Sequence, residues 1–374
     1  MKEYLGNSSS SMELHFLLGD VSSKGGIERV TITLANALSS IYPVKIISLY
    51  QSNESLPFKI SDKVTLEVIS NNYEVSMFNR NFNLFKGLCF DLIYIKNKSK
   101  KIKETKKSNQ VIAISSDVKM SVLANKSGYK NIIAIEHFEY DVISPVLRLV
   151  RKFLYKKIQA VVSLTSEDEG KYKWLPTGKH FVIANIVEQP ISVCEFDSRS
   201  KTVLAVGRLT YQKGFDLLIE AWRYINLPGW TLKIVGDGEE YEKLSLYIKE
   251  HDLQNIQILP FTNNISKYYN DSRVFVLSSR YEGLGMVLVE ALSYGLACIS
   301  FNCPAGPKTI LNQGNGILVE PENVKILANE MTRLMLDKEL QKKMSELGPS
   351  SINRFKSDVI IAQWMQLIKG ARNE

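Results

Sequence analysis

Short apolar runs rich in valine and isoleucine alternate along this chain with segments whose apolar residues recur at helical spacing. Continuous apolar runs of this length are typical of strands that are buried on both faces of a parallel sheet. The pattern therefore predicts α/β layers. The expected strands are 13–18, 44–49, 111–115, 132–136, 160–164 and 181–184 in the first half, and 202–206, 232–235, 256–259, 274–277, 297–300 and 317–319 in the second.

A polar stretch from Glu188 to Lys201, which contains Pro190, interrupts this alternation. Stretches of this kind are typical of loops and linkers. We expect a domain boundary here, between an N-terminal domain of residues 1–188 and a second domain of residues 189–355. Each is predicted to be a doubly wound, Rossmann-like parallel sheet.

The last segment, residues 356–374, has an apolar stripe at helical spacing, formed by Ile361, Trp364, Met365 and Ile368. Such a stripe needs a surface to cover. We expect this helix to cross back onto the N-terminal domain.

The size and charge of the chain limit the possible domain count and binding partners only in part. A chain of 374 residues with 45% hydrophobic content exceeds what one core usually organises, which agrees with two domains. The formal charge of +8, from 47 Lys and Arg against 39 Asp and Glu, favours phosphates, nucleic acid or anionic lipid without choosing among them.

The cysteines and the chain start give two further expectations. Cys89, Cys194, Cys298 and Cys303 have no spacing typical of a ligand set, so reduced thiols and no metal site are predicted. No apolar run reaches the roughly 18 residues that span a bilayer, and residues 1–11 are polar, unlike a signal peptide. We expect a cytoplasmic protein whose first eleven residues, 1–11, form a disordered extension.

Candidate chemistry is sought after the strands, because ligands of open α/β sheets bind beyond the carboxyl ends of the strands. Gly25 and Gly26 precede a predicted helix at 27–39 and would let the backbone and the helix N–H groups approach a ligand. A simple turn explains the two glycines equally well.

Two cations follow the strand 202–206. Arg208 and Lys213 come after Gly207 and before a new helix. An arginine fork and a lysine point charge suit a diphosphate, and together they could neutralise a leaving nucleotide without a metal. Solvated surface cations are the alternative, which their place at a strand end makes less favoured. Gly236, after the next strand, is a second point of close backbone approach.

The richest loop follows the strand 274–277. Gly283 and Gly285 free a loop before a helix that starts near Met286, and its N–H groups form a ready anion site. Glu282 in the loop and Glu290 in the helix could accept hydrogen bonds from sugar or ribose hydroxyls. Because the neighbours of Glu290 are apolar, an unpaired carboxylate there would be costly, and a functional role is favoured.

His137 follows the strand 132–136 in the N-terminal domain. A lone histidine is more often a structural hydrogen-bonding residue than a catalyst. Its place at a strand end favours a role in the site.

With these motifs in this order, the sequence resembles the retaining glycosyltransferases of family 4, which have the two-domain GT-B fold. The resemblance covers nearly the whole chain, and its motifs are specific only as a set. They are GG-x-E at 25–28, EH at 136–137, VGRL-x-x-QKG at 206–214, VGDG at 235–238 and E-x7-E at 282–290.

The resemblance implies a role for each of these positions in a metal-independent hexosyltransferase that retains configuration and forms α-linkages. Arg208 and Lys213 would bind the donor diphosphate, Glu290 the ribose, and Glu282 the donor sugar. The remaining implied roles are the sugar contacts of the backbone at Gly283, Leu284, Gly285, Met286 and Val287, the base near Pro260 and Phe261, Gly26 on the phosphates and His137 on the sugar.

Residues 301–307 look like the C-P-x-G-P stretch of family members that build bacterial surface polysaccharides or lipid-linked oligosaccharides, with Asn302 where many relatives have Asp. This implies a UDP-sugar donor, no cofactor, and a glycan or undecaprenyl-diphosphate-linked acceptor. Nucleic acid is not an expected partner.

The segment 144–157 mixes apolar side chains with five cations, and residues 96–107 are rich in lysine. The first is typical of a helix that rests on anionic lipid, which would place the protein on the inner face of the membrane. A core-packed helix with a solvated face is equally compatible, and a solvated face is the default for 96–107.

Other functions explain the pattern less well. A retaining glycoside hydrolase also uses two carboxylates but needs no cations at a strand end. A sugar-nucleotide epimerase of the same fold is harder to separate. A non-enzymatic basic module leaves the glycine-rich strand ends unexplained, and a dehydrogenase is disfavoured because no G-x-G-x-x-G follows the first strand.

Overall fold

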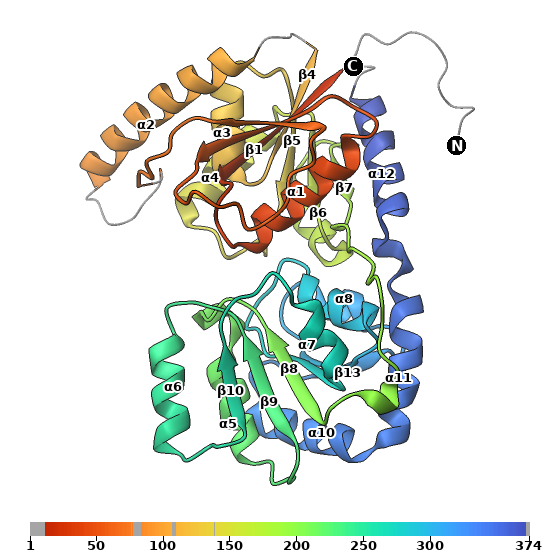
Figure 1. Ribbon diagram of the computed structural model, residues 1–374. Coiled ribbons are helices and arrows are strands. Elements are labelled where there is room, and N and C mark those ends of the chain that lie inside the picture. Colours follow the sequence, from red (N-terminus) through yellow and green to blue (C-terminus); the bar gives the residue numbers. More distant parts are fainter. Residues whose placement is uncertain (1–11, 76, 78–83, 107–109, 138, 372–374) are drawn as a thin grey trace. The chain divides into compact units, whose positions relative to one another are not determined.

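The structure is a computed structural model that describes residues 12–75, 77, 84–106, 110–137 and 139–371 (Figure 1). The predicted extension at 1–11 lies outside these residues. The chain divides into two compact units. Unit 1 comprises Met1–Leu164, Glu169–Ile183 and Ile361–Glu374, and unit 2 comprises Thr165–Asp168 and Ala184–Ile360.

Unit 1 is built on a parallel sheet of seven strands in the order β3-β2-β1-β4-β5-β6-β7. The order reverses at β1, as in doubly wound sheets. The strands are β1 (Glu13–Asp20), β2 (Val44–Tyr50), β3 (Val64–Val68), β4 (Val111–Ser115), β5 (Asn131–Glu136), β6 (Ala160–Ser163) and β7 (His180–Val182).

The helices of unit 1 follow the strands, as the apolar periodicity predicts. They are α1 (Gly26–Leu38), α2 (Leu84–Thr105), α3 (Val118–Lys126), α4 (Pro145–Tyr155) and the short η1 (Ser166–Tyr172), which straddles the unit boundary. Helix α3 contacts both α2 and α4, so these three helices form one layer beside the sheet (Figure 1). Their inner faces and the strands enclose the core of unit 1.

Unit 2 repeats this architecture with a parallel sheet of six strands in the order β10-β9-β8-β11-β12-β13. The strands are β8 (Thr202–Val206), β9 (Thr231–Val235), β10 (Ile256–Leu259), β11 (Val274–Leu277), β12 (Ala297–Phe301) and β13 (Gly316–Val319). Here the order reverses at β8, which places the turns after β8 and β11 at the switch point where such sheets bind ligands.

The helices that follow the strands of unit 2 cover its sheet, and they enclose a core that includes Trp222 and Phe301. The helices from residue 196 to the end of the described chain are η2 (Phe196–Ser198), η3 (Tyr211–Lys213), α5 (Phe215–Arg223), α6 (Tyr241–Glu250), α7 (Ser266–Asp271), α8 (Met286–Ser293), α9 (Pro307–Ile310), α10 (Val324–Leu336), α11 (Lys338–Ser351), η4 (Asn353–Phe355) and α12 (Ser357–Gly370).

Helix α12 begins in unit 2, and from Ile361 onward its residues group with unit 1. The side chains of Trp364 and Ile368 in the expected stripe are buried, together with Leu367. Met365 is only half-buried, so the stripe is shifted slightly from the predicted one.

The predicted fold class is confirmed as two parallel α/β sheets. One strand was not predicted: β3 forms the edge of the first sheet, and only Val64 among its residues is buried. Among the described helices, none is long and apolar enough to cross a bilayer.

Candidate functional site

The turns after β8 and β9 interlock through their backbones. Gly236 has φ +156°, and a Cβ there would lie 1.9 Å from the carbonyl oxygen of Gly207. A Cβ at Gly238 would lie 2.2 Å from the carbonyl oxygen of Leu209, and the Leu209 N–H donates to the Asp237 carbonyl oxygen at 2.8 Å. Only glycine permits these approaches, so the predicted close contact at Gly236 is a contact with the neighbouring turn.

The turn after β8 is also fixed against the turn after β11. Gly214 adopts the left-handed conformation with φ +61°, and a Cβ there would lie 2.2 Å from the Ser278 carbonyl oxygen. The Ser278 hydroxyl donates to the carbonyl oxygen of Lys213 at 2.9 Å. Lys213 is therefore held at the carboxyl ends of two adjacent strands.

Lys213 and Glu282, which lie 69 residues apart in the chain, form an ion pair. Their Nζ and Oε1 atoms are 2.6 Å apart, and the two side chains are only 16% and 7% exposed. The Ser279 hydroxyl donates to the same Oε1 at 2.6 Å. The carboxylate is thus oriented by two donors, and the ammonium retains donors for a further anionic partner.

Arg208 differs from Lys213 in its surroundings. Its side chain is exposed, and the described part of the chain offers its guanidinium no hydrogen bond or ion pair. It follows Gly207 at the end of β8, where the Lys213 side chain runs along the backbone, 3.1 Å from the Cβ position of Gly207. The two predicted cations therefore lie in one turn, one paired and one free.

Arg280 is a central residue of this site that the sequence did not single out. Its guanidinium makes two hydrogen bonds to the Asp216 carboxylate, at 2.9 and 2.7 Å, and donates to the Tyr211 carbonyl oxygen at 2.7 Å. It also lies 3.9 Å from the centre of the Tyr211 ring. Hydrogen bonding to Asp216 raises the pKa of Arg280 despite partial burial. Burial opposes the charge on Asp216, but its bonds to Arg280 outweigh that effect and lower its pKa.

Arg280 thereby clamps the turn that carries Lys213 to the loop after β11. The Arg280 N–H also donates to the Gln212 carbonyl oxygen at 2.8 Å. The only sequence signal for this role was the position of an arginine directly after two serines at a strand end.

The loop from Glu282 to Gly285 leads into α8, which begins at Met286 as predicted. Gly285, with φ +86°, precedes the helix. A Cβ at Gly306 would lie 2.1 Å from the carbonyl oxygen of Leu284, so the loop after β12 packs directly on this one. Because Leu284 is buried, it can offer a ligand only its backbone, whereas Gly283 and Val287 are half-buried.

Glu290 lies about one turn into α8 and is 6% exposed. One of its oxygens accepts a hydrogen bond from the hydroxyl of Tyr269, which is fully buried, at 3.0 Å. This contact gives the carboxylate a partner within the fold, which the sequence did not reveal because a tyrosine in the segment 266–271 carries no distinguishing pattern. The structure therefore does not by itself require a ligand at Glu290.

Pro260 and Phe261 follow β10, beside the turn after β9. The Phe261 N–H donates to Asp237 Oδ1 at 3.0 Å, and Pro260 is exposed. The site of unit 2 is thus assembled from the ends of neighbouring strands of one sheet.

In unit 1, Gly25 precedes α1 in an extended conformation, and Gly26 is the first helical residue. A Cβ at Gly26 would meet no atom within 4 Å. The fold therefore does not demand glycine at 26.

His137 follows β5 and is almost completely buried. Its Nε2 has no hydrogen-bond partner in the residues that the structure describes. Burial lowers the pKa of His137 to about 4, so the imidazole is neutral at pH 7. A neutral imidazole with one free nitrogen can exchange a hydrogen bond with a ligand hydroxyl.

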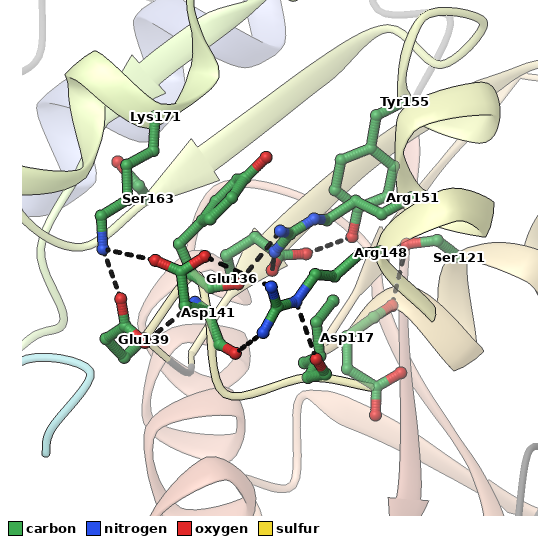
Figure 2. A network of polar contacts seen from close by, with 12 residues as sticks. Asp117, Ser121, Glu136, Glu139, Asp141, Arg148, Arg151, Tyr155, Ser163 and Lys171 are labelled. Atoms are coloured by element: carbon green, nitrogen blue, oxygen red, sulfur yellow. Dashed lines mark hydrogen bonds and ion pairs between the residues drawn. The ribbon is translucent and has the colours of Figure 1, made fainter. Parts of the chain in front are cut away.

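Glu136, the residue before His137, is held by α4 (Figure 2). The fully buried Arg151 lies 3.2 Å from Glu136 Oε2, and the Tyr155 hydroxyl donates to Oε1. Arg151 also donates to the Tyr140 carbonyl oxygen at 3.0 Å. Burial raises the pKa of Glu136, although Arg151 and Tyr155 oppose the shift. Helix α4 therefore holds Glu136, the residue before His137, and Tyr140, three residues after His137.

The described residues contain no group of three His, Cys, Asp or Glu side chains that could hold a metal ion. Within unit 2 the structure brings Lys213 and Glu282 together, in the turn that also carries Arg208, and it gives Glu290 a separate partner. Gly26 and His137 lie in unit 1.

The family model described as Glycosyl transferases group 1 matches residues 191–350. The amylovoran biosynthesis glycosyltransferase AmsD of Erwinia amylovora is 30% identical over 369 residues, which is 95% of this chain and 99% of that protein. A Campylobacter jejuni protein is 26% identical over 97% of this chain and 99% of its own. It is named GalNAc-alpha-(1->4)-GalNAc-alpha-(1->3)-diNAcBac-PP-undecaprenol alpha-1,4-N-acetyl-D-galactosaminyltransferase.

The solved structure of a mutant of S. aureus TarM, in complex with fondaparinux, alpha-GlcNAc-glycerol and UDP, superposes with a TM-score of 0.79. It shares 15% identity and covers 96% of this chain and 99% of its own. This likeness is one of fold, and it agrees with the predicted GT-B class.

Proposed function

Because the chain belongs to the group 1 glycosyl transferases, we propose that it is a retaining, metal-independent member that transfers a hexose or N-acetylhexosamine from a UDP-sugar. The acceptor is a lipid-linked glycan in bacterial polysaccharide or glycan assembly. The observation that carries this proposal is the buried Lys213–Glu282 pair beside the free Arg208, at the carboxyl ends of adjacent strands.

The two cations act on the leaving group. Negative charge develops on the donor diphosphate as the bond to the sugar breaks, and fixed cations stabilise that charge without reorganising. Arg208 supplies a planar fork and Lys213 a point charge. Arg280 holds the turn that carries Lys213 in place through its bonds to Asp216 and Tyr211.

The carboxylates hold hydroxyl groups. Glu282 is oriented by Lys213 and Ser279, and its second oxygen is left to accept a hydrogen bond from the donor sugar. The N–H groups at 283–286 line the same loop, where α8 begins. Glu290, whose carboxylate Tyr269 holds in place, binds the ribose.

The proposal also assigns roles to two residues of unit 1. Gly26 leaves open space at the start of α1, which suits the approach of phosphate oxygens. His137 offers its free Nε2 to a sugar hydroxyl, and the neutral form that burial favours neither repels nor attracts the diphosphate.

The relatives support the choice of donor and acceptor. TarM was solved with UDP, and the Campylobacter protein is named for an alpha linkage and an undecaprenol-linked substrate. AmsD is named for amylovoran biosynthesis. We place the enzyme at the inner face of the cell membrane, where a lipid-linked acceptor would be held.

The proposal is tested by donor binding and product analysis. The thermal unfolding midpoint is measured with UDP-, GDP- and ADP-sugars, since a ligand of the folded state raises it by mass action. The donor that binds is then incubated with undecaprenyl-diphosphate glycans, and the anomeric configuration of the product is read by NMR.

Lys213→Ala should lower turnover by at least about a hundredfold, in the range for losing one charge-stabilising group, while Lys249→Ala on the exposed face of α6 should not. Near-normal turnover of Lys213→Ala would remove it from the site. An isomerised UDP-sugar formed without acceptor would favour an epimerase instead.

A further inference from the structure

Helix α4 has apolar residues on two sides: Leu147, Val150 and Leu154 pack on the core of unit 1, and a second set faces outward. Its most buried residues are Arg151 and Tyr155, both fully enclosed in unit 1. Three apolar residues of α4 are well exposed: Val146, Leu149 and Phe153 are 55%, 58% and 67% exposed. An amphipathic surface helix normally buries its apolar stripe and exposes its polar side chains.

The exposed apolar residues form one stripe. They recur at spacings of three and four residues, so they share one face of the helix. Val142, in the loop before α4, is 43% exposed as well. The composition of 144–157 is compatible with a helix on lipid and with a core-packed helix, and in the structure α4 packs on the core while this stripe faces outward.

Lysines border this stripe. Lys152, Lys156 and Lys157 are exposed, and no ion pair holds them in the ranges that the structure describes. The helix itself contains no acidic residue. Asp141, the nearest acid before it, is engaged by Arg148 and Lys171 (Figure 2).

The stripe cannot simply rotate inward. Arg151 is fixed by Glu136 and by the Tyr140 carbonyl oxygen, and Tyr155 by the same carboxylate. Leu147 and Leu154 already pack on the core from the flanks of the helix. Turning α4 would strand a buried carboxylate, so the outward stripe is a fixed feature of the fold.

We propose that this face of α4, formed by Val146, Leu149, Phe153 and the lysines at 152, 156 and 157, binds the surface of an anionic lipid bilayer. The apolar side chains enter the boundary between headgroups and acyl chains, and the lysines contact acidic headgroups. Charge complementarity favours lipid over a second copy of this chain, because two such faces would bring six unpaired lysines together.

This proposal rests on the proposed function, because the bilayer is where a lipid-linked acceptor would be held. The inner side of α4 holds Glu136 beside His137, and its outer side would contact that membrane. Binding to lipid alone needs neither donor nor acceptor. A vesicle-binding experiment can therefore fail while transferase activity is found, and the reverse.

The test is cosedimentation of the purified full-length protein with vesicles of phosphatidylglycerol and phosphatidylcholine in equal parts, and with phosphatidylcholine alone. We expect binding to the anionic vesicles that weakens at about 0.5 M NaCl, where surface charges are screened. Replacing all three lysines by glutamine should weaken it roughly a hundredfold, at about 1 kcal/mol for each lysine. Leu149→Ala with Phe153→Ser should weaken it at least about tenfold, because both side chains lose apolar contact with lipid.

Matched controls change the same chemistry on unit 2. Lys249, Lys342 and Lys343 replaced by glutamine, and Leu246→Ser with Leu336→Ala, alter exposed residues there and should leave binding unchanged. Equal binding of the α4 variants and the wild type would overturn the proposal. So would a dimer in lipid-free solution that the Leu149→Ala and Phe153→Ser pair dissociates, since the face would then join two copies.

Discussion

Replacing Arg151 by methionine tests the buried contact that holds the loop at His137. The change keeps the length of the side chain but leaves the carboxylate of Glu136 buried without its cation. Removing one partner of a buried ion pair costs about 3–5 kcal/mol, and the hydrogen bond to the Tyr140 carbonyl oxygen is lost as well. With a urea m-value of about 2–3 kcal/mol/M, the unfolding midpoint of unit 1 should fall by about 1–2.5 M.

The loss of unfolding free energy in Arg151→Met should depend on pH, and the direction of this dependence follows from the pKa of Glu136. Burial raises this pKa in the folded protein, and loss of Arg151 raises it further. A carboxyl with a raised folded pKa binds its proton more tightly when folded, so stability is lost as pH rises from the unfolded to the folded pKa. The Arg151→Met variant should therefore be closest to wild type in acid and fall behind as pH rises.

Urea unfolding of wild type and variant at a series of pH values, followed by tryptophan fluorescence, measures this difference. Adding Glu136→Gln to Arg151→Met removes the stranded charge and should recover much of the loss, which provides the control. A deficit below about 1 kcal/mol at neutral pH, well under the cost of stranding a buried charge, or one that does not change with pH, would show that the Glu136 charge is compensated by something other than Arg151.

Two further predictions concern the donor site. Glu290→Gln should chiefly raise the KM for donor, because an amide replaces the carboxylate that we propose accepts from ribose, and an unchanged donor KM in steady-state assays would refute the ribose role. Gly236→Ala should lose more than about 1 kcal/mol in urea unfolding, because the new Cβ would meet the Gly207 carbonyl oxygen at 1.9 Å. A Gly236→Ala variant as stable as the wild type would contradict the interlock of the two turns. Gly26→Ala, whose Cβ would meet no atom within 4 Å, should keep its stability and lose activity.

The strands were predictable because most of them are continuous apolar runs buried on both faces. Those at 111–115, 202–206, 256–259 and 274–277 have the predicted bounds. The strand β3 was missed for the corresponding reason: at the sheet edge only Val64 is buried, so its sequence lacks a run of apolar residues.

The sequence placed candidate site residues in the loops after the strands, but it did not predict their contacts. Glycines and charges at strand ends identified Lys213 and Glu282, but a pair 69 residues apart leaves no local pattern. Arg280 and Tyr269 were missed for the same reason, since each acts through a distant partner.

The orientation of α4 could not be read from periodicity. Two apolar sets recur at helical spacing, Leu147, Val150 and Leu154 on the core side and Val146, Leu149 and Phe153 on the outer side, and the spacing does not distinguish them. Arg151 and Tyr155 lie on the core side because they have a buried carboxylate to bind. A buried Glu136 at the end of an apolar strand was the signal that could have suggested inward-facing polar residues on the next helix.

The interlocked turns after β8 and β9 limit how the proposed donor site can be redesigned. The backbones of Gly207 and Gly236 are in direct contact, and the Leu209 N–H donates to the neighbouring turn. The conformation of each turn therefore depends on the other. Residues exchanged with a relative in one turn alone would meet a mismatched surface in the other. Segments 207–214 and 236–240 therefore behave as one structural unit. Libraries or chimeras that vary the proposed donor site should replace both segments together.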